Sequence, residues 1–163
     1  MKTLLYILLI LSCTVSAQKI KTNAPEIVLP VITDFMEDGL ENGFYSKFHI
    51  EENLSAILFI PKKEMNDYVH SDNPYRAASI NVSHHPVWMG KIIMVIDEKH
   101  KRDFLGTQVI IYHELFHLFG GRHLEKPLLN SAVSTREYNS KNIAGLFHEI
   151  KEIPPNHYLK PER

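Results

Sequence analysis

The chain has 163 residues and a formal net charge of −1, since 19 acidic residues nearly balance 18 basic ones. This length is ample for one hydrophobic core and short for two domains. The near-neutral charge lacks the basic excess of nucleic-acid-binding proteins, so we expect no nucleic acid as a partner. No apolar stretch is long enough to span a bilayer, so we also expect no transmembrane anchor.

The N-terminal segment has the features of a secretory signal peptide. It begins with the basic Lys2, continues with the apolar residues 4–11, and offers Val-Ser-Ala at residues 15–17 for cleavage. The mature chain, residues 18–163, would then be secreted or held in the cell envelope. It would contain no cysteine, which favours a bacterial envelope or medium over disulfide-dense eukaryotic secretion. The single cysteine, Cys13, ends a weak likeness of a lipobox, and a lipoprotein is the alternative interpretation.

The spacing of apolar residues predicts an α+β fold. A helix is expected over residues 23–43, with Pro25 or Pro30 near its first turn. Four strands should follow, over residues 44–50, 54–60, 77–82 and 91–97. The second and fourth are continuous apolar runs, typical of strands covered on both faces. The third is short and partly polar, and we expect it at an edge of the sheet.

Two further helices are expected after the strands. Residues 103–119 are apolar on most faces, which predicts a buried helix with Asp103 as the N-cap and Gly120 as the stop. Residues 140–152 carry apolar side chains on one stripe and should form a final amphipathic helix. That stripe consists of Ile143, Leu146, Phe147 and Ile150.

The longest predicted helix carries the residues of a metal site, in the order H-E-L-F-H-L-F-G-G-R-H. His113 and His117 are four residues apart, so on a helix they project from one face and can reach the same ion. Gly120 can end the helix and let the chain turn back, which brings His123 to the metal from another direction. Glu114 points beside the metal, where it can act as general base on a zinc-bound water. Three histidines leave a coordination position open, which is typical of catalytic zinc.

This spacing resembles the H-E-x-x-H-x-x-G-x-x-H signature of the metzincin metallopeptidases, and every fixed position is matched. The resemblance implies zinc as the cofactor, with the three histidines as ligands and Glu114 as the general base. It also implies a single metzincin-like domain in which a helix packs on a small mixed sheet. The active cleft would lie between an N-terminal part, residues 18–119, and a small C-terminal part, residues 120–163, with the final helix. Small secreted bacterial members are nearest in length.

One feature of the clan departs from its usual form in this chain. Metzincins have a methionine in a turn beneath the metal, and the best candidate turn here is residues 127–131, with Leu129 at the methionine position. Leucine and methionine have similar volumes and that methionine is not a ligand, so we expect the exchange to be tolerated. The clan also opens with a strand, which only residues 18–21 can supply.

We therefore expect a zinc-dependent endopeptidase, a hydrolase that acts on a peptide or protein substrate, and we expect it to be a monomer. An alternative is a non-catalytic zinc-bearing binding or inhibitor module on the same scaffold, although such a module would not need Glu114. Zinc capture in the envelope is a third interpretation, which the lack of histidine-rich runs disfavours. If residues 77–82 form an exposed edge, an extended peptide could add to it through backbone hydrogen bonds.

Several other polar residues are weaker candidates for the site. Three of them could stabilise the oxyanion that forms on the attacked carbonyl: Tyr112, Tyr138 and His148. His84 and His85 precede Pro86, and we expect them to be exposed loop histidines without a role in metal or substrate binding.

Overall fold

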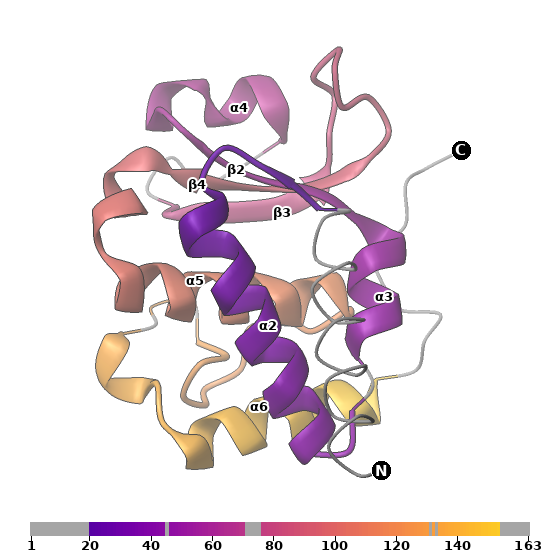
Figure 1. Ribbon diagram of the computed structural model, residues 1–163, viewed down its shortest axis with the longest axis vertical. Coiled ribbons are helices and arrows are strands. Elements are labelled where there is room, and N and C mark those ends of the chain that lie inside the picture. Colours follow the sequence, from indigo (N-terminus) through magenta and orange to yellow (C-terminus); the bar gives the residue numbers. More distant parts are fainter. Residues whose placement is uncertain (1–19, 45, 71–75, 131, 133, 154–163) are drawn as a thin grey trace, which may run out of the picture.

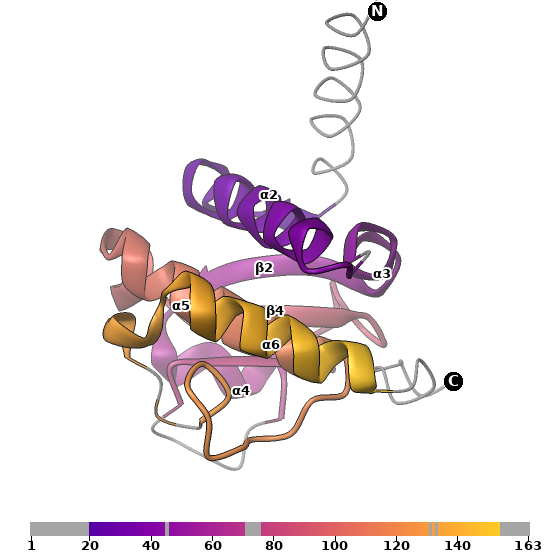
Figure 2. The same cartoon turned by 90° about the horizontal axis from the view of Figure 1, so that it is seen from below.

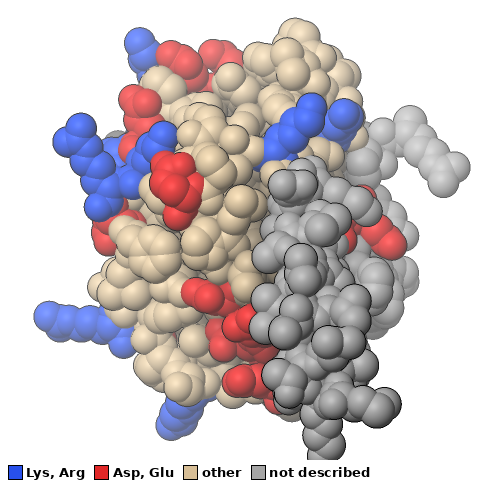
Figure 3. Space-filling view, in the orientation of Figure 1, with Lys and Arg blue, Asp and Glu red and all other residues tan. Residues whose placement is uncertain are grey.

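The structure is a computed structural model that describes residues 20–44, 46–70, 76–130, 132 and 134–153. The expected signal peptide, residues 1–17, and Cys13 within it lie outside the described residues. Among the helices that the structure describes, none is both long and apolar enough to cross a membrane. Acidic and basic side chains lie among one another on the face of the molecule seen in Figure 3.

A four-stranded mixed sheet lies at the centre of the fold, in the order β1-β2-β4-β3. The strands are β1 (Lys21–Thr22), β2 (Leu54–Ile60), β3 (Ala78–Val82) and β4 (Ile92–Asp97). β1 and β4 both run parallel to β2, whereas β3 is antiparallel to β4 and forms an edge. Three of the predicted strands are confirmed, with β2 at the expected bounds and the partly polar β3 at the expected edge.

Helices cover both faces of this sheet (Figure 1). They are α2 (Pro25–Glu41), α3 (Ser46–Asn53), α4 (Met65–Tyr68), α5 (Phe104–Leu118) and α6 (Ser140–Glu152), with short 3₁₀ helices η2 (Lys62–Glu64), η3 (Glu98–Arg102) and η4 (Thr135–Glu137). Helix α4 lies on one face, and α2 and α5 lie on the other. Helix α5 runs between the sheet and α6, as both views show (Figure 1, Figure 2).

The two central strands are buried on both faces, as their apolar runs predict. All six residues of β4 are buried. Ile57 and Met94 belong to the main core on the side of α2 and α5. Ile93 and Val95 belong to a smaller cluster with Met65 of α4 on the opposite face. A sheet enclosed in this way is a rigid platform for the elements attached to its edge.

The first helix forms where predicted and is tied to the sheet at its start. Pro25 occupies the first turn, where its missing N–H costs no intrahelical bond. Just before it, the Asn23 side chain donates to the Phe59 carbonyl at 2.7 Å and accepts from the Phe59 N–H at 2.9 Å. The amide of Asn23 therefore continues the short β1 ladder against β2 and holds the entry into α2.

The strand expected over residues 44–50 is wrong, because α3 occupies residues 46–53. The apolar residues of so short a segment fit both a period of two and a helical period, so the pattern does not discriminate. Glu51 and Glu52 are favourable in helices and unfavourable in strands. Ile50 is fully buried in the main core although its segment is helical.

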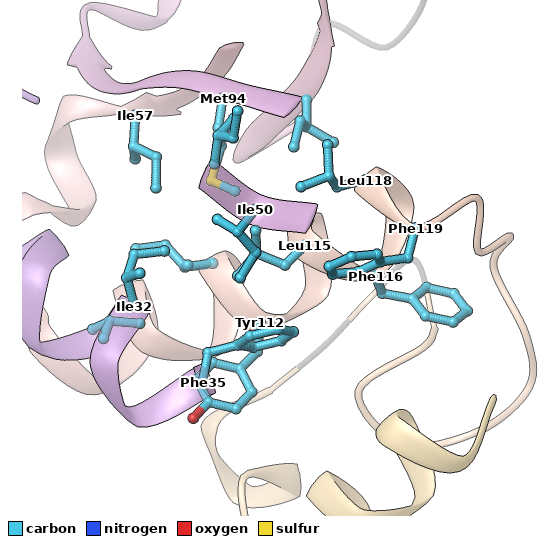
Figure 4. Close-up of a cluster of buried hydrophobic side chains, with 14 of the residues drawn as sticks. Ile32, Phe35, Ile50, Ile57, Met94, Tyr112, Leu115, Phe116, Leu118 and Phe119 are labelled. Carbon is cyan, nitrogen blue, oxygen red and sulfur yellow. The ribbon is translucent and has the colours of Figure 1, made fainter. Parts of the chain in front are cut away.

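An aromatic cluster joins α2, α5 and α6 beneath the sheet, and Figure 4 shows Phe35 and Tyr112 within it. The ring of Phe35 lies 4.9 Å from the rings of both Tyr112 and Phe147, measured between centroids. Phe44 packs edge-on against Phe119 at 5.0 Å. Each such pair contributes roughly 0.5–1.5 kcal/mol beyond the burial of its surface. The final helix, which has the predicted bounds and buried stripe, is thereby fixed against the helix that carries the histidines.

Candidate metal centre

Helix α5 begins with the predicted cap. The Asp103 side chain accepts a hydrogen bond from the Gly106 N–H at 2.9 Å. A side chain at position 106 would collide with this carboxylate, so glycine leaves the space that the cap needs. The cap satisfies one of the N–H groups that a helix start leaves without an intrahelical partner.

The end of α5 turns the chain back sharply. Gly120 has a φ of 84°, the left-handed conformation that glycine adopts without strain. The N–H of Gly120 donates to the His117 carbonyl at 2.9 Å, and the N–H of Gly121 donates to the Phe116 carbonyl at 3.0 Å. These two bonds form a Schellman motif. A Cβ on Gly121 would overlap the Phe116 ring, so this glycine is required by close packing.

The turn brings the third histidine of the motif to the other two. The Nε2 atom of His117 lies 3.1 Å from the Nε2 atoms of both His113 and His123, and the remaining pair is 3.2 Å apart. A metal with bonds of about 2.0–2.1 Å in tetrahedral geometry would hold its nitrogen ligands roughly 3.3 Å apart. The three side chains therefore form a group that could hold a metal ion.

Hydrogen bonds on the opposite side of two rings decide where their protons are. His113 Nδ1 donates to the Leu128 carbonyl at 2.9 Å, and His117 Nδ1 donates to the Gly121 carbonyl at 2.8 Å. A carbonyl only accepts, so Nδ1 carries the proton and Nε2 of each neutral ring presents a lone pair. Burial lowers the pKa of His113 to about 4 and also lowers the pKa of His117, so both rings are neutral at pH 7.

The convergence of these lone pairs is the observation that fits a bound cation. Two bare nitrogens 3.1 Å apart repel each other, and no proton is available between them to make a hydrogen bond. A metal ion placed between the rings turns this repulsion into coordination, and the backbone carbonyls then orient the ligands from behind.

The segment that follows His123 contacts the histidine cluster through Leu128. Leu128 is fully buried and has a φ of 63°, a left-handed conformation that costs a non-glycine residue roughly 1–3 kcal/mol. Its carbonyl is the acceptor for His113. Leu129, at the expected methionine position, is also buried in the main core, and its carbonyl accepts from the Leu124 N–H at 2.9 Å. The predicted turn therefore contacts a histidine of the cluster directly.

Glu114 lies in a pocket of about 590 Å³ that also holds the three histidines. The side chain is only 8 % exposed. Burial raises the pKa of Glu114 to about 7, and the positive charge of Arg76 and a hydrogen bond from the Ile80 backbone limit the rise. The carboxyl group is therefore close to half-protonated at neutral pH, and it can both take and return a proton.

The edge strand β3 forms one wall of this pocket. The Asp97 N–H donates to the Ala77 carbonyl at 2.9 Å, and the Ser83 N–H donates to the Lys91 carbonyl at 2.8 Å. Because antiparallel pairing alternates, the backbone groups of the even-numbered residues of β3 face away from β4. One of them, the Ile80 N–H, reaches Glu114. The expected open edge therefore lies beside the metal centre.

Three residues suggested for the oxyanion lie elsewhere. The Tyr112 hydroxyl donates to the Asp38 carboxylate at 2.5 Å, on the side of α2, and burial and this bond raise its pKa. Tyr138 packs edge-on against Tyr112 at 5.2 Å. His148 is exposed on α6. None of these three side chains lines the described pocket.

The expectation that His84 and His85 are exposed is wrong. Both are half-buried, because their rings stack on residues at the end of α4. His84 lies 4.2 Å from His70, and His85 lies 4.2 Å from Tyr68, measured between ring centroids. They hold the β3–β4 hairpin against α4, away from the metal centre.

Arg76 is a pocket residue that no sequence pattern predicted. It lies two positions before the first residue of β3, lines the pocket, and donates from Nη1 to the Ser79 hydroxyl at 2.8 Å. A single arginine before a predicted strand has no characteristic spacing. Only the folding of β3 against α5 brings it close to Glu114.

Comparisons with family models, with curated proteins and with solved structures find no match for this chain. The structure itself supports a three-histidine cluster at the end of a helix behind a mixed sheet, which is consistent with a metzincin-like site.

Proposed function

We propose that the protein is a zinc-dependent endopeptidase. The proposal is carried by one observation: two unprotonated Nε2 atoms and a third Nε2 converge within 3.2 Å beside a buried carboxylate, in an open pocket. Imidazole donors suit zinc, and a set of three protein ligands is typical of catalytic zinc sites. Peptide hydrolysis is the reaction that the metzincin resemblance of residues 113–123 implies.

Each side chain has a distinct part in this reaction. Zinc would supply Lewis-acid chemistry, polarising the substrate carbonyl and lowering the pKa of a water to about 7. His113 and His117 are held in orientation by the Leu128 and Gly121 carbonyls. Glu114 takes one proton from the attacking water as the water oxygen bonds to the carbonyl carbon. When the C–N bond breaks, the nitrogen keeps the bonding pair and Glu114 returns the proton to it.

The wall of the pocket suits an extended substrate. A peptide lying along β3 would pair with the backbone groups of Ala78, which face away from β4. This pairing would present one peptide bond to Glu114 and the histidines, without requiring a particular substrate side chain. We place the reaction in the cell envelope or the medium, since the N-terminal segment has the features of a signal peptide.

The pocket favours catalysis over the alternative of a non-catalytic zinc-binding module. Desolvation of the Glu114 carboxyl is unfavourable, as the raised pKa of this group indicates. A module that only binds zinc gains nothing from such a group beside its metal. A peptidase needs it there, because general acid–base catalysis accelerates a reaction by roughly 10²–10⁴-fold.

The test is to purify the protein, measure zinc per chain by plasma mass spectrometry, and assay cleavage of a mixed peptide library. We expect one zinc and cleavage in the wild type. Glu114→Gln should keep the zinc and lose cleavage, and His117→Ala should lose both. His148→Ala, which alters an exposed histidine of α6, is the matched control and should change neither. One zinc without cleavage by the wild type would overturn the peptidase and favour the binding module.

A further inference from the structure

Arg76 places a positive charge at the reacting end of the pocket. This charge lowers the pKa of Glu114 and the pKa of His117, so the guanidinium lies near both the proposed base and one histidine of the cluster. Arg76, Glu114 and His117 also line the same pocket, where a substrate carbonyl would enter.

The guanidinium is held by one hydrogen bond within the part of the chain that the structure describes. Its Nη1 donates to the hydroxyl of Ser79, which is fully buried on β3. Among the residues that the structure describes, Arg76 forms no ion pair, although Glu114 is close enough to attract it. Arginine has five N–H donors in a rigid fork, so several remain for a ligand.

Two other polar residues of the pocket, His100 and Asp103, are less suited to the reacting carbonyl. His100 and Asp103 precede α5, and Glu114 lies eleven positions after Asp103 along the helix. At 1.5 Å per residue this is a separation of roughly 16 Å. Asp103 is also negatively charged and already caps the helix. The tyrosines of positions 112 and 138 are engaged on the side of α2.

We propose that Arg76 is a catalytic residue, whose guanidinium donates a hydrogen bond to the oxygen of the attacked carbonyl. This inference rests on the proposed peptidase function. As the water oxygen bonds to the carbonyl carbon, the π electron pair moves onto the carbonyl oxygen and gives it a negative charge. The water proton goes to Glu114 at the same step. When the pair returns to re-form the carbonyl, the C–N bond breaks and Glu114 protonates the amine.

A donor aimed at this oxygen stabilises the transition state more than the bound substrate, because the oxygen gains charge only during the reaction. Arg76 should therefore affect kcat and leave KM almost unchanged. If Arg76 only set the protonation of Glu114, its removal would move the pH profile and leave kcat at the optimum intact. These two outcomes separate a catalytic residue from a group that acts through Glu114.

The kinetic test compares Arg76→Gln and Arg76→Lys with the wild type on one cleaved peptide, across the pH profile. We expect Arg76→Gln to lower kcat at its optimum by roughly 100-fold or more, with KM within about twofold. Arg76→Lys keeps the charge without the fork and should recover part of the loss. Arg102→Gln, on the exposed η3 turn outside the pocket, is the matched control and should behave as the wild type.

The binding test does not depend on turnover. A phosphinic peptide carries a charged tetrahedral group where the reacting carbonyl would be, whereas the parent peptide does not. Calorimetry should show that Arg76→Gln lowers the affinity for the phosphinic peptide by about the same factor by which it lowers kcat. The parent peptide, measured in the uncleaving Glu114→Gln background, should bind with the same affinity whether or not position 76 is changed.

The outcomes distinguish this inference from the proposed function. If the wild type cleaves peptides and Arg76→Gln cleaves them with unchanged kcat, the role of Arg76 is overturned and the peptidase stands. An equal loss of affinity for both peptides would also overturn it, because Arg76 would then bind substrate and transition state alike. If the wild type binds zinc, cleaves nothing and ignores the phosphinic peptide, the peptidase itself fails and the role of Arg76 fails with it.

Discussion

The histidines of the cluster are held in two different ways. His113 and His117 lie on α5, with buried or half-buried rings whose Nδ1 atoms donate to backbone carbonyls. His123 lies in the loop after the helix, is exposed, and has no described partner for its Nδ1 atom. The first two rings keep their tautomer and direction without a metal, whereas the direction of the third depends on the turn at Gly120.

This difference indicates how the site is assembled. A helix can place two ligands in advance at little entropic cost, because its backbone is already ordered by α5 packing under the sheet. The third histidine comes from the loop after the helix, and one side of the cluster remains open to the pocket. Changes on the helix should therefore affect metal binding more than the equivalent change in the loop.

The largest expected effect is the loss of a helix ligand. His113→Ala removes a preorganised donor and leaves the Leu128 carbonyl without its partner, so we expect zinc affinity to fall by roughly 1,000-fold or more. His123→Ala should cost less, because that ring has less orientation to lose. Competition with a chelator of known affinity measures both. Equal losses would contradict the distinction between helix and loop ligands.

The second-largest effect is a pH dependence of folding stability in the metal-free protein. The pKa of His113 is 6.5 in an unfolded chain and about 4 in the folded one. Between these two pH values the unfolded chain binds a proton that the folded chain does not. The contribution of His113 to the free energy of unfolding is therefore complete above pH 6.5 and falls as the pH decreases toward 4. For His113 this loss is about 3 kcal/mol. Urea unfolding in a chelator measures it, and His113→Gln should flatten the curve over this range.

A smaller effect is expected from moving the Gly121 carbonyl, which orients His117. Gly121→Ala forces a methyl group against the Phe116 ring, which displaces the carbonyl that orients His117. Loss of such an orienting partner lowers metal affinity by about 10–100-fold. Gly145→Ala is the matched control, since its Cβ on α6 meets nothing within 4 Å. It should stabilise the helix by about 0.5–1 kcal/mol and leave zinc affinity unchanged.

The smallest effect is expected at the far end of α5. Asp103→Ala removes the cap on the Gly106 N–H and should cost about 1 kcal/mol of folding stability. The cap is remote from the cluster, so zinc affinity should stay at its wild-type value. Thermal unfolding and chelator competition on the same samples test both parts. A tenfold change in affinity would show that the whole helix, and not only its last turns, positions the ligands.

Much of the local structure was predictable, because it depends on near neighbours in the chain. β2 and α6 have the predicted bounds, and the cap at Asp103 and the stop at Gly120 occur where expected. The strand expected over residues 44–50 is a helix, since its short apolar pattern fits either period and packing against the core decided between them. Patterns are informative over long segments and ambiguous over short ones.

By itself, the sequence determined which residues could bind a metal, because the helix period and a glycine-assisted turn bring residues 113, 117 and 123 together from short range. Only the tertiary structure decided the rest. The Ile80 backbone of β3 bonds to Glu114, the charge of Arg76 acts on Glu114 from just before β3, and the Leu128 carbonyl meets His113 through a strained turn. Such contacts join segments that no local period relates, so they exist only once the sheet and α5 have packed against each other.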